Sequence, residues 1–127
     1  MRQPPIKNFF ATLAFSISSL AEAQQLDIVQ IMGQFVQASY ATSRCAKPDP
    51  KTLSSFLANF KVVSVRATEE LEKRNPNQSE QQIVEGLKQG AVAVEKAIDE
   101  AIRSNGCTDS RIQDLIKRFE VQANLKL

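Results

Sequence analysis

Two cysteines are the residues of this chain best suited to chemistry of their own. Cys45 lies in the polar stretch SRCAKPDP at residues 43–50, and Cys107 lies in SNGCTDS at residues 104–110. They do not form a Cys-x-x-Cys pair, so thiol–disulfide catalysis is not expected, and two thiolates alone make a poor zinc site. An even number of cysteines in an exported chain favours a disulfide. We therefore expect a structural disulfide between Cys45 and Cys107.

The chain contains no histidine. This excludes the Ser-His-Asp and Cys-His nucleophile systems, the Glu-x-x-His di-iron motif and the Cys-x-x-Cys-His haem attachment site. Glu69, Glu70 and Glu72 could in principle bind a cation, but neighbouring residues of a helix point in different directions and each has a basic residue nearby, which favours a solvated face. We expect no catalytic residue, no metal and no cofactor, and hence no enzyme.

One sequence motif indicates a modification site. Asn77-Gln78-Ser79 is a formal N-glycosylation acceptor. The alternative is structural, because Ser79 and Gln82 also have the spacing of a helix capping box, with Asn77 in the turn before it. Asn77 is therefore a candidate glycosylation site with a competing use.

The N-terminus has the three parts of a secretory signal peptide. Arg2 and Lys7 supply a positive region, residues 9–20 form a short apolar region, and the tripeptide at residues 21–23 has the small-x-small pattern that a signal peptidase accepts. An N-terminal membrane anchor is the alternative. Roughly a dozen apolar positions, interrupted by serine and threonine, fall short of the ~20 that a bilayer span needs.

The expected cleavage site follows directly from this pattern. Ala21 and Ala23 are the small residues, and Gln24 would be the first residue of the mature chain. The signal peptide then covers residues 1–23, and one domain covers residues 24–127. We expect the mature protein in the periplasm or outside the cell, without stable insertion into a membrane.

The composition of the mature chain indicates a helical protein that does not bind nucleic acid. The whole chain has a formal net charge of +2, and loss of Arg2, Lys7 and Glu22 with the signal leaves +1. A nucleic-acid-binding protein usually has a basic excess on one face. The absence of Trp, the single Tyr and the few Gly favour helices over a sandwich or barrel.

Four stretches of the mature chain have helical periodicity. The first covers residues 25–42, the second starts at the cap Asp49 and Pro50 and ends before Pro76, the third runs from the cap Ser79 to Gly106, and the fourth starts near Thr108 and Asp109 and ends near Ala123. The expected apolar faces are, in chain order, Ile28, Val29, Met32, Phe35, Val36, Tyr40; Leu53, Phe56, Leu57, Phe60, Val63, Ala67, Leu71; Val84, Leu87, Ala91, Val94, Ile98, Ile102; and Ile112, Leu115, Ile116, Phe119, Ala123.

The third helix also has a row of small residues and a set of charged ones. The row should allow another helix to pack closely inside the bundle, with a dimer contact as the alternative. It comprises Gly86, Gly90, Ala93, Ala97 and Ala101. Among the charged residues, Asp99 and Arg103 are four apart and are expected to pair on the helix surface.

Four amphipathic helices with short connections predict an all-α, up-down-up-down four-helix bundle. In such a bundle the first and third connections lie at the same end. Cys45 is expected in the first connection and Cys107 in the third, so the topology agrees with the disulfide. The layout is broadly similar to that of small periplasmic acid-stress chaperones, although no residue motif carries that likeness.

Two functions are compatible with these features. The first is an exported, non-enzymatic protein that acts through contacts with an unknown protein partner, as a chaperone-like, inhibitor-like or accessory factor. The second is a carrier that holds a small apolar ligand between its helices. The residues that could line such a ligand site, or simply fill the core, are Met32, Phe35, Phe56, Phe60 and Phe119.

Overall fold

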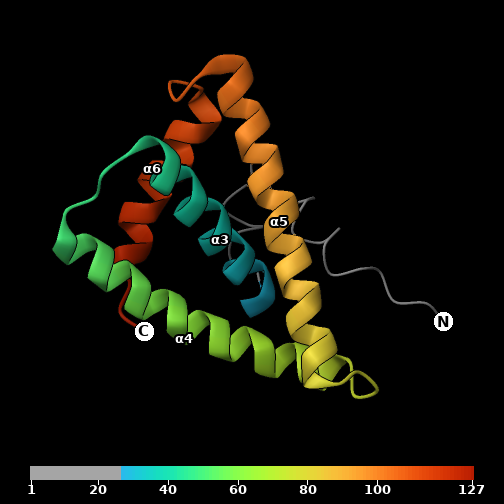
Figure 1. The fold of residues 1–127 in the computed structure, drawn as a ribbon. Helices are drawn as coiled ribbons and strands as arrows, with labels where there is room; N and C mark the ends of the chain where they lie inside the picture. The colour runs from blue at the N-terminus through green and yellow to red at the C-terminus, as the bar shows by residue number, and fades with distance from the viewer. Residues whose placement is uncertain (1–26) are drawn as a thin grey trace.

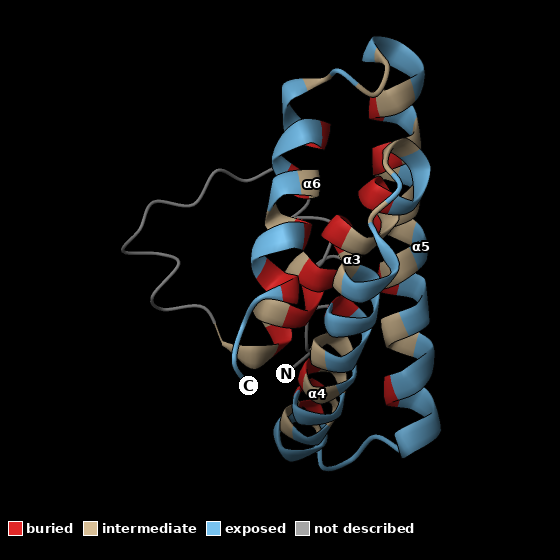
Figure 2. Cartoon of the chain, turned by 90° about the vertical axis from the view of Figure 1, so that its left-hand side faces the viewer, coloured by how far each residue is buried: buried red, intermediate tan, exposed pale blue. Residues whose placement is uncertain are grey.

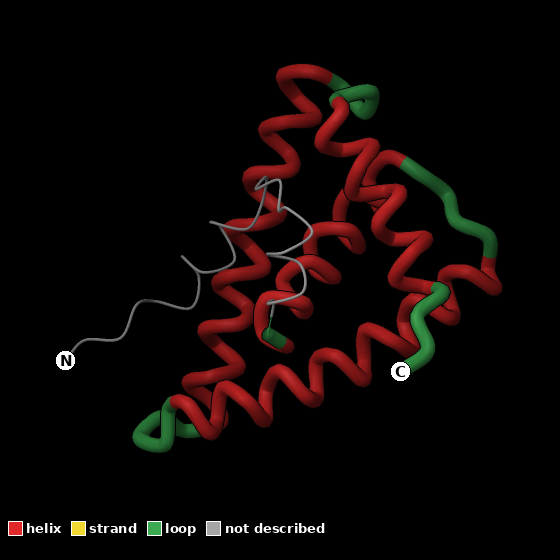
Figure 3. Tube along the Cα trace, turned by 180° about the vertical axis from the view of Figure 1, so that it is seen from behind, coloured by secondary structure: helices red, strands yellow, loops and turns green. Residues whose placement is uncertain are grey.

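A computed structural model describes residues 27–127, which fold into four α-helices. With the labels of Figure 1, they are α3 (Ile28–Cys45), α4 (Pro50–Arg74), α5 (Glu80–Asn105) and α6 (Ser110–Ala123). Short loops connect them (Figure 3). The described part of the chain is therefore all-α with four helices, as the sequence predicts. The predicted signal peptide, with Ala21, Ala23 and Gln24, lies outside the described residues.

Each helix begins at a side chain that caps its first turn. Ser79 and Gln82 form the expected capping box, and Asp49 accepts a hydrogen bond from the backbone N–H of Thr52 at 2.9 Å. A second capping box joins Asp27 and Gln30, with hydrogen bonds of 2.9 and 3.2 Å. These caps satisfy backbone N–H groups that have no partner inside the helix.

The first helix is shifted along the chain from its expected position. Its capping box at Asp27 starts α3 at Ile28, three residues later than the predicted residue 25. The helix also continues past residue 42 and ends at Cys45. Cys45 therefore lies in the last turn of α3, and its predicted position in the following loop is wrong. The sequence prediction missed this box because Asp27 and Gln30 both lie within residues 25–42, the span already assigned to the helix.

α3 lies in the middle of the fold and contacts the other three helices. In Figure 1, α4, α5 and α6 outline a triangle with α3 inside it, and each helix turns back from the one before it. Central placement explains why buried residues surround α3 on more than one face: Val29, Met32, Gly33, Phe35, Gln37, Ala38, Ala41 and Thr42. The helices are splayed, since α5 and α6 meet only near their shared turn and contact each other least of all pairs.

Four phenylalanines form the centre of the core. Phe35 of α3 and Phe56 of α4 have no solvent exposure. The Phe56 ring lies 5.3 Å from that of Phe35, 5.7 Å from that of Phe60, and is stacked at 4.1 Å on Phe119 of α6. These rings connect three helices, so they stabilise the fold by burial and by ring-to-ring contact.

Two of the predicted apolar faces differ from the observed ones. Leu53 and Leu57 of α4 remain 40% and 52% exposed, because the apolar arc of α4 is wider than the surface that its neighbours cover. In α5 the core position is Ile83, which is fully buried, whereas Val84 is 38% exposed. Two adjacent apolar residues fit the helical period about equally well, so the sequence alone did not decide between them.

Candidate functional site

A disulfide joins Cys45 to Cys107. It connects the end of α3 to the turn between α5 and α6, and the two Cα atoms are 5.6 Å apart, as is usual for disulfides. Both cysteines of the chain are used in this bond, so neither is present as a thiol. The pairing of Cys45 with Cys107, and the location of both cysteines at the same end of the fold, agree with the sequence prediction.

A polar cluster lies one turn before the disulfide on α3. The Tyr40 hydroxyl is 2.9 Å from each carboxylate oxygen of Asp99 on α5, to which it donates, and Arg44 forms an ion pair with Asp99. Arg44 also donates to the Tyr40 hydroxyl at 3.4 Å. The hydrogen bond to Tyr40, followed by the charge of Asp99, raises the pKa of Arg44. The cluster therefore adds a polar link between α3 and α5 beside the covalent one.

This cluster corrects one expectation. Among the described ion pairs, Asp99 pairs with Arg44 on the neighbouring helix, and its expected pairing with Arg103 does not form. The central position of α3 brings Tyr40 and Arg44 against α5, where both bond to the Asp99 carboxylate. Sequence spacing gave no indication of this contact, because the two partners are 55 residues apart.

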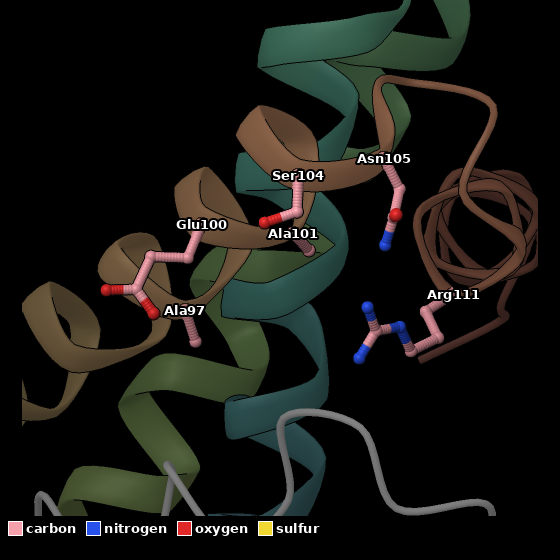
Figure 4. A pocket seen from close by; sticks show the side chains of 6 residues that line it. All are labelled: Ala97, Glu100, Ala101, Ser104, Asn105 and Arg111. Atoms are coloured by element: carbon pink, nitrogen blue, oxygen red, sulfur yellow. The ribbon is translucent and has the colours of Figure 1, made fainter.

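A cleft of about 360 Å³ lies between the last turns of α5 and the start of α6 (Figure 4). Ala97 and Ala101 contribute small side chains to it, and its polar lining residues are Glu100, Ser104, Asn105 and Arg111. The small-residue row of α5 therefore does not pack closely on α6 here, because the two helices diverge. Within the row, Gly90 and Ala101 are buried and the other three are half-buried.

One side of the cleft is fixed by Asp109, the N-cap of α6. Its carboxylate accepts hydrogen bonds from Asn105 at 2.8 Å and from the Arg111 guanidinium at 3.0 Å. The hydrogen bonds from Arg111, followed by that from Asn105, hold the pKa of Asp109 well below its usual range. The cleft is thus bordered by charged and amide groups whose positions are set by α6 capping.

The five candidate ligand-lining residues are brought together, but in the core. Met32, Phe35, Phe56 and Phe119 are buried and Phe60 is half-buried against them. None of them lines the cleft between α5 and α6. Their side chains contact one another, which is the arrangement expected of ordinary core residues.

The outer surface of α4 combines exposed apolar and basic side chains. Leu53, Leu57 and Val65 are 40%, 52% and 51% exposed. Three basic residues in the same stretch of the helix, between residues 51 and 66, are also exposed, and Figure 2 shows the exposed outer turns of α4 in pale blue. We refer to these six residues as the α4 face: Lys51, Leu53, Leu57, Lys61, Val65 and Arg66.

The remaining sequence candidates occupy exposed positions. Asn77 is exposed in the turn between α4 and α5, while the Ser79 hydroxyl accepts a hydrogen bond from Gln82 N–H at 3.1 Å as the cap of α5.

Within the acidic group of α4, Glu70 pairs with Arg74 at 3.0 Å. In residues 27–127, no group of three or more His, Cys, Asp or Glu is arranged to hold a metal ion. None of the described helices has the length and apolar character of a membrane span.

Comparison with known proteins identifies no relative of this chain. No family model matches the chain, and no curated protein and no solved structure is significantly similar to it. A function for the chain therefore has to be argued from its own residues, of which the α4 face, the cleft and the disulfide-linked end are the distinctive features.

Proposed function

We propose that the chain is exported and acts without catalysis, by binding other proteins through the α4 face. The observation that carries this proposal is the exposure of Leu53 and Leu57, which lie one turn apart on the same side of α4. Contiguous exposed apolar surface on a folded domain marks contact sites, whereas single exposed apolar residues are common everywhere. Val65, two turns further on, extends the apolar surface along the helix.

The disulfide supports the same proposal. It links the end of α3 to the turn between α5 and α6 in a domain whose helices are splayed, and such links are typical of small proteins in oxidising compartments. A rigid domain presents its exposed leucines at a constant geometry, which lowers the entropy that binding costs. Contact with many unfolded chains would make the protein chaperone-like, and contact with one folded protein would make it an inhibitor or an accessory factor.

Export is tested by the mass of the mature protein. The full chain, produced in a bacterium with a periplasm, should be recovered from the periplasm or medium with Gln24 as its first residue. Intact mass spectrometry measures this directly. Recovery of the uncleaved chain from the cytosol, with Met1 or Arg2 at its start, would contradict export.

The contact function is tested on the mature chain with two matched variants. The double variant Leu53→Ser/Leu57→Ser removes the apolar pair, and Val92→Ser removes one apolar side chain that is 62% exposed on α5. We expect the wild type and Val92→Ser to slow the aggregation of a chemically denatured client protein equally, as followed by light scattering. The double variant should lose this effect while its far-ultraviolet circular dichroism stays unchanged.

An amino acid with a photo-crosslinking side chain distinguishes a chaperone-like protein from an inhibitor or accessory factor. Placed at position 57, it should give many products with a chaperone-like protein and one product with an inhibitor or accessory factor. The same residue at position 92 serves as the control. If position 57 gives no product that position 92 lacks, and the wild type does not slow aggregation, the proposed contact function is wrong.

The carrier function has no observation in its favour. The side chains that would line an apolar ligand site fill the core, and four of the six residues that line the described cleft are polar: Glu100, Ser104, Asn105 and Arg111. A carrier would show a bound apolar molecule in native mass spectrometry. We therefore place the function on the surface of α4 and not between the helices.

A further inference from the structure

The first three quarters of α4 have an uneven charge. Between residues 50 and 68 the helix contains three basic residues and no acidic one. Acidic residues return only at Glu69, Glu70 and Glu72 in the last two turns. The part of α4 that exposes its leucines is therefore the part that carries only positive charge.

The three basic side chains of the α4 face are available for a partner. Lys51, Lys61 and Arg66 are exposed, and in the described residues none of them forms an ion pair, whereas Arg44, Arg74 and Arg111 do. Asp49 adjoins Lys51, but its carboxylate is used as the cap of α4, accepting from both the N–H and the hydroxyl of Thr52. The positive charge of the face is thus not neutralised by other helices.

The C-terminal tail lies beside the same helix. Asn59 of α4 donates hydrogen bonds to the carbonyl oxygens of Gln122 at 2.8 Å and Leu125 at 3.0 Å. The tail contributes Leu125 and Leu127, which are 41% and 54% exposed, and the exposed Lys126. Its composition repeats that of the α4 face, with apolar and basic side chains and no acidic one.

We propose that the α4 face binds an acidic segment of a partner protein, in which carboxylates flank apolar side chains. The leucines would contact the apolar side chains, and Lys51, Lys61 and Arg66 would pair with the carboxylates. Complementary charge of this kind selects the partner and speeds the encounter. The inference rests on the proposed contact function and adds the chemistry of the partner.

A protein segment fits this face better than a membrane surface. A helix that binds in the membrane interface places a continuous apolar face into the lipid. Here the most apolar side of α4, with Phe56 and Val63, is buried in the core. The apolar residues on the outer side are only about half exposed, and the charged Lys61 lies between them. Leu53, Leu57, Lys61 and Val65 follow one another at intervals of four residues, so they form a mixed strip along α4 that an extended peptide can follow. Lys51 and Arg66 lie further round the exposed side of the helix, within reach of carboxylates at the edge of the peptide.

Two synthetic peptides test the inference directly. Both have 16 residues and the same leucine positions, but one carries Glu and the other Lys at every charged position. Binding of each fluorescent peptide to the mature chain is measured by anisotropy at low salt. We expect the Glu peptide to bind at least tenfold more tightly than the Lys peptide, and the preference to shrink at about 0.5 M salt because exposed charges are then screened.

Charge-reversed variants locate the preference on the molecule. Lys51→Glu/Lys61→Glu/Arg66→Glu should reverse the preference between the two peptides. The matched control Lys88→Glu/Lys96→Glu/Arg103→Glu reverses three exposed charges of α5 and gives the same net charge. The control should keep the preference for the Glu peptide. Should the triple α4 variant lose helical circular dichroism, Lys61→Gln/Arg66→Gln replaces it and should reduce the preference.

Each contrary result has a separate meaning. Equal binding of both peptides would overturn the acidic partner and leave the apolar contact of the proposed function intact. Equal effects of the α4 and α5 variants would assign the preference to net charge and not to the α4 face. Binding to vesicles of phosphatidylglycerol, without binding to the Glu peptide, would make the face a lipid-binding surface. Binding to neither probe also overturns the inference, and the crosslinking at position 57 then decides the proposed function alone.

Discussion

Removal of the disulfide is the perturbation with the largest expected effect outside the core. Cys45 and Cys107 are 62 positions apart, so the bond closes a loop that contains all of α4 and α5. In the chain-entropy description, a loop of this length lowers the entropy of the unfolded chain enough to stabilise the fold by about 4 kcal/mol. Domains of this size have unfolding free energies of about 5–15 kcal/mol in total. The bond therefore accounts for a large share of the stability.

The double variant Cys45→Ser/Cys107→Ser should melt at a much lower temperature than the wild type. For a domain of about 100 residues, each kcal/mol corresponds to roughly 4–8 °C, so a loss of about 4 kcal/mol corresponds to roughly 15–30 °C. Thermal unfolding of the mature chain, followed by far-ultraviolet circular dichroism, measures the shift. The melting temperature of each single variant should fall as far as that of the double variant, because each single substitution removes the same bond.

Reduction of the wild type provides the control. An excess of reductant should lower its melting temperature to that of the double variant and leave the double variant unchanged. The folded, reduced protein should keep α3 and α5 in contact at low temperature, since Tyr40 and Arg44 still bond to Asp99. The reasoning fails if the oxidised, denatured wild type titrates with two free thiols, or if the double variant melts within about 3 °C of the wild type.

Four further changes test other parts of the fold. Tyr40→Phe should lower the unfolding free energy by about 1 kcal/mol in urea titrations, through loss of the hydroxyl bond to Asp99; no change would mean that this bond is replaced by water at no cost. Phe56→Ala should lower it by about 3–5 kcal/mol, because the ring is fully buried between two helices. Gln37→Met should raise it by about 1 kcal/mol, since the buried amide of Gln37 has no hydrogen-bond partner among residues 27–127; a decrease would show that the amide is satisfied in solution. Asp109→Asn should destabilise the fold near neutral pH, and the gap in melting temperature to the wild type should close as the pH falls below about 4. The sign follows from the lowered pKa of Asp109: its carboxylate stabilises the fold above its ordinary pKa of 3.8, and this contribution is lost on acidification. A gap that widens in acid would contradict the assignment.

Local signals in the sequence allowed much of the fold to be predicted. The caps at Asp49 and Ser79 act on backbone groups within one turn, so the starts of α4 and α5 could be read without knowing what surrounds them. Gly106 ends α5 with a φ of 76°, a conformation that glycine adopts easily. The disulfide could be predicted because only two cysteines were present and the order of the helices placed them at one end.

Features that depend on which helix lies in the middle could not be predicted. The pairing of Asp99 with Arg44 requires α3 to pack against α5, and a helix-surface pair with Arg103 was the local alternative. The same holds for Leu53 and Leu57, whose spacing fits a core stripe. Their exposure depends on how far α3 and α6 cover α4. Periodicity states which residues share a face, but only the packing decides how much of a wide face is buried.

The outer surface of α5 can be compared directly with that of α4. Both helices are long, with 26 and 25 residues, and both present an outer side to solvent. On α5 the exposed charges are of both signs, as with Glu85 and Lys88 or Lys96 and Glu100, which is the usual pattern of a solvated helix. The exposed charges of α4 are all positive up to Glu69 and lie among half-exposed leucines. If solubility alone had shaped the surface, the two helices should look alike. The difference between them is the reason to place the proposed contact function on α4.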